Sequence, residues 1–302
     1  TELLGVGGMD SSVWLAMQAP VERPVAVKLL PPTTQQAAER FARGARIASK
    51  LNHPHITVVH DYGRTEDGHL YLVMELLEGH SLQSIVKRGP LPFERVLHIT
   101  DQILKALDHA HRRHVVHRDI KPGNLFLTQR NDDPDFTKVL DFGIARFVDD
   151  PDGSYDGQDA ADEITTARQI CGTPQYMAPE QITGGPVDQR SDLYALGVVV
   201  YRMLTGRLPF VDKDHGALFM HHVHSTPPPL AEVRPGLTCP PELEAMVLRA
   251  LAKRPEDRYA SAAEMRRALR QIQRRLGLLA ITSEDSASIS RVDTPPPLSE
   301  TR

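Results

Sequence analysis

His117-Arg118-Asp119-Ile120-Lys121-Pro122-Gly123-Asn124 is the most informative stretch of this sequence, and Asp141-Phe142-Gly143 begins 22 residues after Asp119. The first segment places His, Arg, Asp, Lys and Asn within eight residues. A polar turn after a helix would explain one such cluster, but it gives no reason for the second motif. The two segments together therefore indicate a chemical site rather than ordinary surface.

Phosphoryl transfer requires the residue types that these segments contain. A carboxylate accepts the proton of the attacking hydroxyl, a cation steadies the moving phosphoryl group, and amide and carboxylate oxygens hold Mg²⁺. On this interpretation Asp119 is the base, Lys121 is the cation, and Asn124 and Asp141 are the metal ligands. The chain here resembles a eukaryotic-like (bacterial-type) Ser/Thr protein kinase catalytic domain, which implies ATP and Mg²⁺ as cofactors.

The resemblance extends to the expected nucleotide site. Ala26-Val27-Lys28 is similar to the strand whose lysine, here Lys28, grips the α- and β-phosphates as a third catalytic residue. Met74 would be the gatekeeper before a hinge whose backbone contacts adenine. The resemblance implies an ATP site made of Gly5, Gly7, Val13, Ala26, Lys28, Glu75, Leu77 and Phe126. The apolar members of this set are equally consistent with ordinary core positions.

The pattern along the chain predicts an α+β, two-lobed protein kinase fold, with a small β-rich lobe before a larger, mainly helical one. Strand-like alternation with one helix occupies residues 1–77, and helical periodicity dominates residues 78–276. Residues 277–302 are rich in Ser and Pro, which is typical of a flexible linker. We therefore expect one kinase domain over residues 1–276.

Local signals mark several elements of these lobes. Alternation predicts a strand over Val25–Leu30, and Thr33 with Gln36 forms a capping box that starts a helix ending near Lys50. The nearly apolar segment Leu193–Tyr201 predicts a helix at the centre of the larger lobe.

Three further residues match structural positions of the family. Glu180 and Arg258 match its buried ion pair, and Asp192 matches the residue that holds the backbone of the catalytic loop. The resemblance therefore implies structural rather than catalytic roles for these three side chains.

The segment between Asp141 and Glu180 carries most of the expected regulatory residues. Thr165 and Thr166 lie where similar kinases are phosphorylated, and Arg118 would supply the counter-charge. Thr173 belongs to a pattern that resembles Ser/Thr-specific rather than Tyr-specific kinases. Residues 149–163 hold seven acids and no base, so added negative charge nearby is disfavoured. Ordinary loop threonines remain the alternative interpretation.

The glycine-rich turn departs from the family pattern. Its third glycine is absent, and the turn is one residue longer than usual. Gly5 and Gly7 still allow close approach of the backbone to phosphates. We therefore expect nucleotide binding, and only the closure of the turn over the phosphates depends on the altered pattern.

A second departure concerns the helix of the small lobe. The family has a glutamate there that pairs with the strand lysine, and this chain has Gly44 at that position. Glu39 is five residues away, about 140° round a helix, so we expect it to face elsewhere. Lys28 therefore lacks its usual partner on the helix, and two hypotheses follow. One is an active Ser/Thr kinase, slow or dependent on a partner, and the other is a pseudokinase that binds ATP or acts as a scaffold.

Composition excludes several other classes of protein. The 35 Lys and Arg against 39 Asp and Glu give a formal net charge of -4, which is no nucleic-acid footprint. The longest nearly apolar run has nine residues, whereas a bilayer span needs about 20. Two cysteines suit a reducing compartment.

These features, with the resemblance, set the expected partners and location. We expect protein substrates with Ser or Thr, no nucleic acid, and no membrane contact by this segment. A dimer through the N-lobe is a further possibility. The expected location is cytoplasmic, either free or tethered to a membrane by a segment outside this chain.

Overall fold

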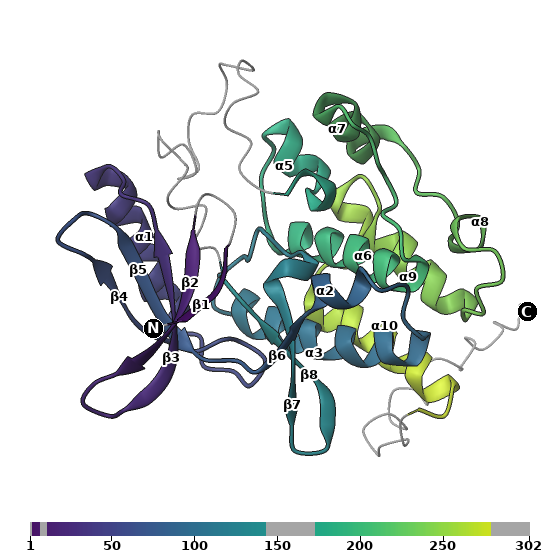
Figure 1. The fold of residues 1–302 in the computed structure, drawn as a ribbon. Coiled ribbons are helices and arrows are strands. Elements are labelled where there is room, and N and C mark those ends of the chain that lie inside the picture. The colour runs from purple at the N-terminus through teal and green to yellow at the C-terminus, as the bar shows by residue number, and fades with distance from the viewer. Residues whose placement is uncertain (1, 7–10, 143–172, 279–302) are drawn as a thin grey trace, which may run out of the picture.

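The chain forms a small β-rich lobe and a larger helical lobe that lie side by side (Figure 1), as expected from the sequence. The computed structural model describes residues 2–6, 11–142 and 173–278. The small lobe comprises β1 (Glu2–Val6), β2 (Ser12–Gln18), β3 (Arg23–Leu30), α1 (Gln35–Ala48), β4 (Val59–Arg64) and β5 (Leu70–Glu75).

The small lobe is one antiparallel sheet covered by α1 (Figure 1). Its strand order is β1-β2-β3-β5-β4, so β3 lies at the centre between β2 and β5. One face of the sheet packs against α1 through a shared apolar core. That core contains Ala26, Leu30, Phe41, Ala45, Ala48, Leu70, Leu72 and Met74. The central strand, which also carries Lys28, is thereby held rigidly.

The start of α1 corrects one prediction from the sequence. The N-cap is Thr34, whose Oγ1 accepts a hydrogen bond from the Ala37 backbone N–H at 3.2 Å, so the predicted capping box of Thr33 and Gln36 is wrong. Two adjacent threonines compete for this position, and the residue types alone do not separate them. The helix ends at Ala48, two residues before the predicted end.

The large lobe is built around a buried central helix. Its elements are β6 (Gly79–Ser81), α2 (Leu82–Val86), α3 (Phe93–His111), β7 (Leu125–Arg130), β8 (Asp133–Val139), α5 (Pro179–Thr183), α6 (Gln189–Thr205), α7 (His215–His224), α8 (Leu230–Val233), α9 (Pro241–Ala250) and α10 (Ala262–Arg275), with 3-10 turns η1 (Pro122–Asn124), η2 (Pro174–Tyr176) and η3 (Pro255–Asp257). Helix α6 begins at the N-cap Asp188 and is buried along most of its length, which confirms the predicted central helix.

Two backbone connections join the small lobe to the β6-β7-β8 sheet. The loop of residues 55–58, between α1 and β4, runs parallel to β8, with Thr57 N–H donating to Val139 O at 3.0 Å and Val139 N–H donating to His55 O at 2.9 Å. After β5 the chain enters β6, which pairs with β7. Gly79 has φ 147°, and a Cβ there would collide with the Leu127 carbonyl oxygen, so this crossing requires glycine.

None of the helices in the described part of the chain is long and apolar enough to cross a bilayer.

Candidate active site

Asp119 lies between a cation and an amide in the loop before η1. Its Oδ2 pairs with Lys121 Nζ at 2.7 Å and accepts from Asn124 Nδ2 at 2.9 Å. The same Asn124 nitrogen donates to the Asp119 carbonyl oxygen at 2.8 Å. The Asp119 side chain is 25% exposed, so one carboxylate is fixed by two neighbours and still reaches solvent.

The backbone of this loop is held by a buried carboxylate on α6, as predicted for Asp192. Its two oxygens accept from the backbone N–H groups of His117 at 2.8 Å and Arg118 at 2.7 Å. His111 on α3 adds a third contact, from Nε2, at 2.8 Å. Arg118 has φ 67°, a conformation that costs energy in a non-glycine residue. Asp192 therefore stabilises a strained loop whose next residue is Asp119.

Burial and nearby positive charge act in opposite directions on Asp192. Burial by itself raises the pKa of this carboxyl. The hydrogen bond and charge of His111, together with His117, outweigh burial and hold the pKa below its ordinary value. The carboxylate is therefore the stable form at the position where it organises the loop.

Asp141 follows β8 and pairs directly with the lysine of the central strand. Lys28 Nζ lies 2.5 Å from Asp141 Oδ2, and the two side chains are 17% and 19% exposed. Burial raises the pKa of Asp141, but the Lys28 ammonium, with smaller contributions from His117 and Lys121, brings it below its ordinary value. Asp141 has φ 55°, so it too occupies a strained backbone conformation.

The two motifs that the sequence singled out are brought together by His117 and Asn124. The buried His117 ring contacts the Leu140 carbonyl through Nε2 at 2.8 Å and lies 4.7 Å, centroid to centroid, from the Phe142 ring. Leu140 N–H donates to the Asn124 carbonyl at 2.9 Å. The loop that carries Asp119 and the turn that carries Asp141 therefore lie against each other.

The face of α1 toward the sheet carries no carboxylate at position 44. Gly44 is buried, while Glu39 is exposed and accepts from Gln35 Nε2 at 3.1 Å. Glu39 therefore faces away, as expected. Lys28 is nevertheless not left without an anion, because it pairs with Asp141.

The residues expected around adenine lie on the strands that border the cleft. In the sheet register Ala26 is opposite Met74 on β5, and Val13 is opposite Lys28. Glu75 ends β5, and Phe126 on β7 pairs with Lys138. Leu77 follows β5 in the connection to β6.

The glycine-rich turn is described only in part. A Cβ at Gly5 would meet no atom of the other described residues within 4 Å, its two chain neighbours aside. Gly7 lies outside the described residues, as do Thr165 and Thr166.

A second network of buried polar contacts supports the loop that carries Asp119. Glu180 and Arg258 form the expected buried ion pair, with two contacts of 2.7 and 2.8 Å, and Ser191 Oγ donates to Glu180 at 2.6 Å. Gln181 Nε2 donates to the Arg118 carbonyl at 3.2 Å. Thr173 immediately precedes η2, the turn that comes before α5 and its Glu180.

Asn124 and Asp141 provide the kind of ligand that Mg²⁺ prefers. Mg²⁺ is held through oxygen atoms, usually of one or two carboxylates together with the phosphates of the substrate. The Asn124 amide nitrogen already donates to Asp119, so its oxygen is the end available to accept. In the described ranges no group of three or more His, Cys, Asp or Glu side chains could hold a metal ion by itself. The residues fit a metal that arrives with a nucleotide.

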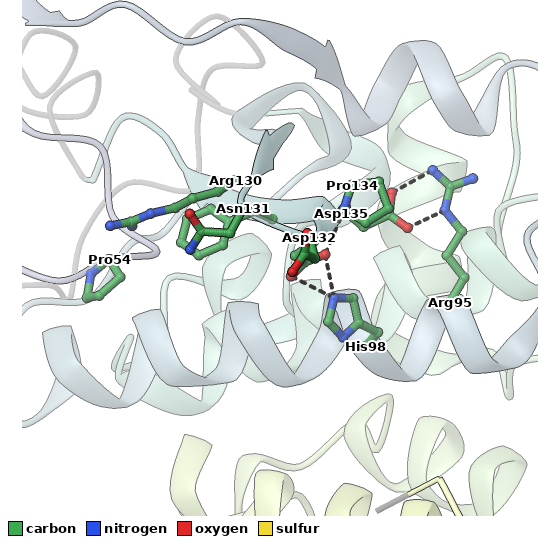
Figure 2. A pocket seen from close by; sticks show the side chains of 10 residues that line it. Pro54, Arg95, His98, Arg130, Asn131, Asp132, Pro134 and Asp135 are labelled. Atoms are coloured by element: carbon green, nitrogen blue, oxygen red, sulfur yellow. Dashed lines mark hydrogen bonds and ion pairs between the residues drawn. The ribbon is translucent and has the colours of Figure 1, made fainter.

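A separate surface cavity of about 1010 Å³ lies beside the β7–β8 turn and α3 (Figure 2). Arg95 makes two contacts with Asp135, and His98 contacts Asp133. These carboxylates are already paired, and none of the residues proposed for catalysis or metal binding lines the cavity.

Lys138, on β8, is the residue of this region that the sequence reasoning missed. Its ammonium contacts Glu75 Oε1 at 2.7 Å and the residue is 8% exposed. The available signal was a lysine in an otherwise apolar strand end, three residues before Asp141.

Comparison with known proteins agrees with this geometry. A model of the protein kinase domain matches residues 1–269. Serine/threonine-protein kinase pkn3 of Myxococcus xanthus is 41% identical over 299 residues, covering 98% of this chain and 53% of the relative. Serine/threonine-protein kinase Pkn1 of the same organism is 44% identical over 269 residues, covering 88% and 37%. Serine/threonine-protein kinase PknB of Mycolicibacterium smegmatis is 38% identical over 317 residues, covering 98% and 48%.

A solved structure shows the same fold. The crystal structure of Rad53 1–466 in complex with AMP-PNP is similar with a TM-score of 0.67 and 26% identity, over 88% of this chain and 62% of that one. The chain spans about half the length of the curated relatives it matches. Their names give no support to the pseudokinase alternative. The protein kinase domain model, which matches residues 1–269, establishes that this chain belongs to the protein kinase family.

Proposed function

We propose that this chain is an active Ser/Thr protein kinase domain, which transfers the γ-phosphoryl group of ATP to Ser or Thr hydroxyls of proteins. The observation that carries the proposal is the Asp119 carboxylate, held by Lys121 at 2.7 Å and Asn124 at 2.9 Å and still open to solvent. Contacts between neighbouring residues link Asp119, Lys121, Asn124 and Asp141, the large-lobe side chains that the proposed transfer uses, which supports the proposal. A chain that only bound nucleotide would not require this arrangement.

In the proposed reaction, Asp119 accepts the proton of the substrate hydroxyl as its oxygen bonds to the γ-phosphorus. The bond from that phosphorus to the β,γ-bridging oxygen breaks, and ADP leaves with the electron pair. Lys121 offsets the charge that spreads over the phosphoryl oxygens. Asn124 and Asp141 would hold Mg²⁺, which supplies further charge neutralisation when bound.

Lys28 and the strands that border the cleft would bind the nucleotide. Lys28 would release Asp141 in part and contact the α- and β-phosphates, while the backbone of Gly5 and Gly7 approaches them. The adenine ring would lie between Val13 and Ala26 on one side and Phe126 on the other. The backbone of Glu75 and Leu77 would form its hydrogen bonds.

Autophosphorylation would regulate the domain. Thr165 and Thr166 are the proposed acceptors, and Arg118, which immediately precedes Asp119, would pair with the phosphate. Thr173 would contribute to the preference for Ser and Thr over Tyr. The names of the relatives, all Ser/Thr kinases, support this preference.

Two finer proposals concern the partners and the location of this chain. Exposed apolar side chains on the small lobe, including Met17 at 63% and Val21 at 72%, favour a dimer through this lobe. Sedimentation of the chain with and without Met17→Glu would test the dimer, because one charge on such a surface should leave only monomer.

We also propose a cytoplasmic location for this domain, which the unpaired thiol of Cys239 suits.

Intact-mass spectrometry after incubation with Mg²⁺ and ATP tests the central proposal. We expect stepwise additions of one phosphoryl mass in the native chain. In Asp119→Asn the rate should fall about 10²- to 10⁴-fold, since a general base is lost. Fragment mapping would then locate the modified residues. No added mass in the native chain, although ATP still raises its melting temperature, would refute the proposed activity.

A further inference from the structure

A buried cation links β8, the strand that precedes Asp141, to the hinge of the small lobe. Lys138 Nζ donates to Glu75 Oε1 at 2.7 Å and to the Ile56 carbonyl at 3.3 Å. The lysine is 8% exposed, and Ile56 is 2% exposed. A charge this far from solvent is costly unless its partners are fixed. The contact therefore ties together three segments of the chain.

The Glu75 carboxylate is also held by the loop of residues 55–58. Val58 N–H donates to Glu75 Oε1 at 2.8 Å, and Glu75 N–H donates back to the Val58 carbonyl at 3.0 Å. The loop also bonds to β8 through Thr57 and Val139. Glu75, the loop and β8 thus form one continuous hydrogen-bonded unit, in which Lys138 is the only side chain that spans from β8 to the hinge in the described residues.

This unit joins the two ends of the proposed nucleotide site. Glu75 stands at the adenine end, through its backbone, and Asp141 stands at the phosphate end, three residues after Lys138. In this chain Gly44 supplies no carboxylate to fix Lys28 from the helix. The distance between the two ends must therefore be set by other contacts.

We infer that Lys138 is a positioning residue for phosphoryl transfer, which sets the place of Asp141 relative to the hinge through Glu75. This inference rests on the proposed function, but it concerns how the nucleotide's phosphate end is aligned rather than whether the chain is a kinase. Lys138 contacts neither nucleotide nor substrate. It acts through the strand that it holds.

Two ligands separate this role from a general structural one. Adenosine uses the hinge alone, whereas Mg²⁺ with the ATP analogue AMP-PNP uses both ends of the site. In Lys138→Met we expect the affinity for Mg²⁺–AMP-PNP to fall about tenfold while adenosine affinity changes less than about twofold. Isothermal titration calorimetry on the 302-residue chain measures both. The kcat of autophosphorylation should fall with the analogue's affinity.

Further variants make the assignment specific. Glu75→Gln keeps the hinge backbone and should weaken the analogue selectively, and Lys138→Met/Glu75→Gln should be no weaker than Lys138→Met, because both changes remove one interaction. Lys138→Arg keeps a cation and should restore most of the lost affinity. Arg95→Met is the matched control, since it removes an ion pair to Asp135 elsewhere on the same strand (Figure 2). It should leave both affinities unchanged.

The results separate this inference from the proposed function. Equal weakening of both ligands in Lys138→Met, or no weakening of either in the folded variant, would overturn the inference while the native chain still phosphorylates itself. A native chain that binds both ligands but does not phosphorylate itself would contradict the proposed function. The two ligand affinities could still be measured in that case and would still test the role of Lys138. If Lys138→Met does not fold, Glu75→Gln decides alone: a loss confined to the analogue supports the inference, and an equal or absent loss contradicts it.

Discussion

Two ion pairs, Glu180–Arg258 in the large lobe and Lys28–Asp141 at the cleft, show how differently this chain uses charge. Arg258 is 2% exposed and makes two contacts with Glu180, while its remaining N–H groups donate to backbone carbonyls. Lys28 makes one contact with Asp141, and both side chains stay partly exposed. The first pair is complete within the protein. The second leaves capacity for a ligand.

The two aspartates of the catalytic loop region differ in the same way. Asp192 is 1% exposed. Its carboxylate oxygens accept from the backbone N–H groups of His117 and Arg118 and contact His111 Nε2. Asp119 meets only side chains and its carboxylate is 25% exposed. Buried, saturated charges therefore build the site in this chain, and exposed, partly satisfied ones are left to act in it.

The largest expected effect on stability comes from breaking the saturated pair. Arg258→Met would leave the Glu180 carboxylate buried without its cation, so the free energy of unfolding should fall by about 3–5 kcal/mol. Lys28→Met should cost less stability than Arg258→Met, because Asp141 keeps contact with solvent, while phosphorylation activity falls sharply. Urea unfolding measures both values. Equal losses of stability would remove the distinction between the two pairs.

A smaller effect should appear in the pH dependence of stability, through His222 on α7. Burial, followed by the charge of Lys253, lowers the pKa of His222 from 6.5 to about 4, and the residue is fully buried. Between pH 6.5 and 4 the unfolded chain binds this proton and the folded chain does not. Stability is therefore full above pH 6.5 and falls toward pH 4 by at most about 1.4 kcal/mol per unit from this residue.

His222→Asn provides the control, because its amide oxygen can still accept from the Tyr194 hydroxyl, which contacts His222 Nδ1 at 2.9 Å. The variant should show a shallower slope of unfolding free energy over this pH range. A slope identical to that of the native chain would mean that His222 does not titrate as inferred. The measurement is urea unfolding at a series of pH values.

Much of the large lobe could be predicted because its residues are set by short, dense motifs. The roles expected for Asp192 and for Glu180 with Arg258 appear as contacts in the structure, and the apolar run Leu193–Tyr201 lies in the central helix. Such features combine local spacing with burial, both of which leave a clear trace in one sequence.

The remaining features depend on contacts between distant segments. Lys28 and Asp141 are 113 positions apart, and nothing in either local pattern indicates that they pair when Gly44 removes the usual partner. Lys138 and Glu75 are 63 positions apart and belong to different lobes. The predicted start of α1 was wrong for a local reason, because Thr33 and Thr34 are both suitable N-cap residues.

The central claim is that this cleft works without a carboxylate on α1, because Asp141 takes the charge of Lys28. The most direct test compares autophosphorylation rates of the native chain and Gly44→Glu under identical Mg²⁺ and ATP, with melting temperatures as the check on folding. We predict a measurable native rate and a gain of less than about fivefold in the variant, the range of a partly exposed ion pair. A gain of about 100-fold or more would contradict the account, because it would show that the native site is impaired by Gly44.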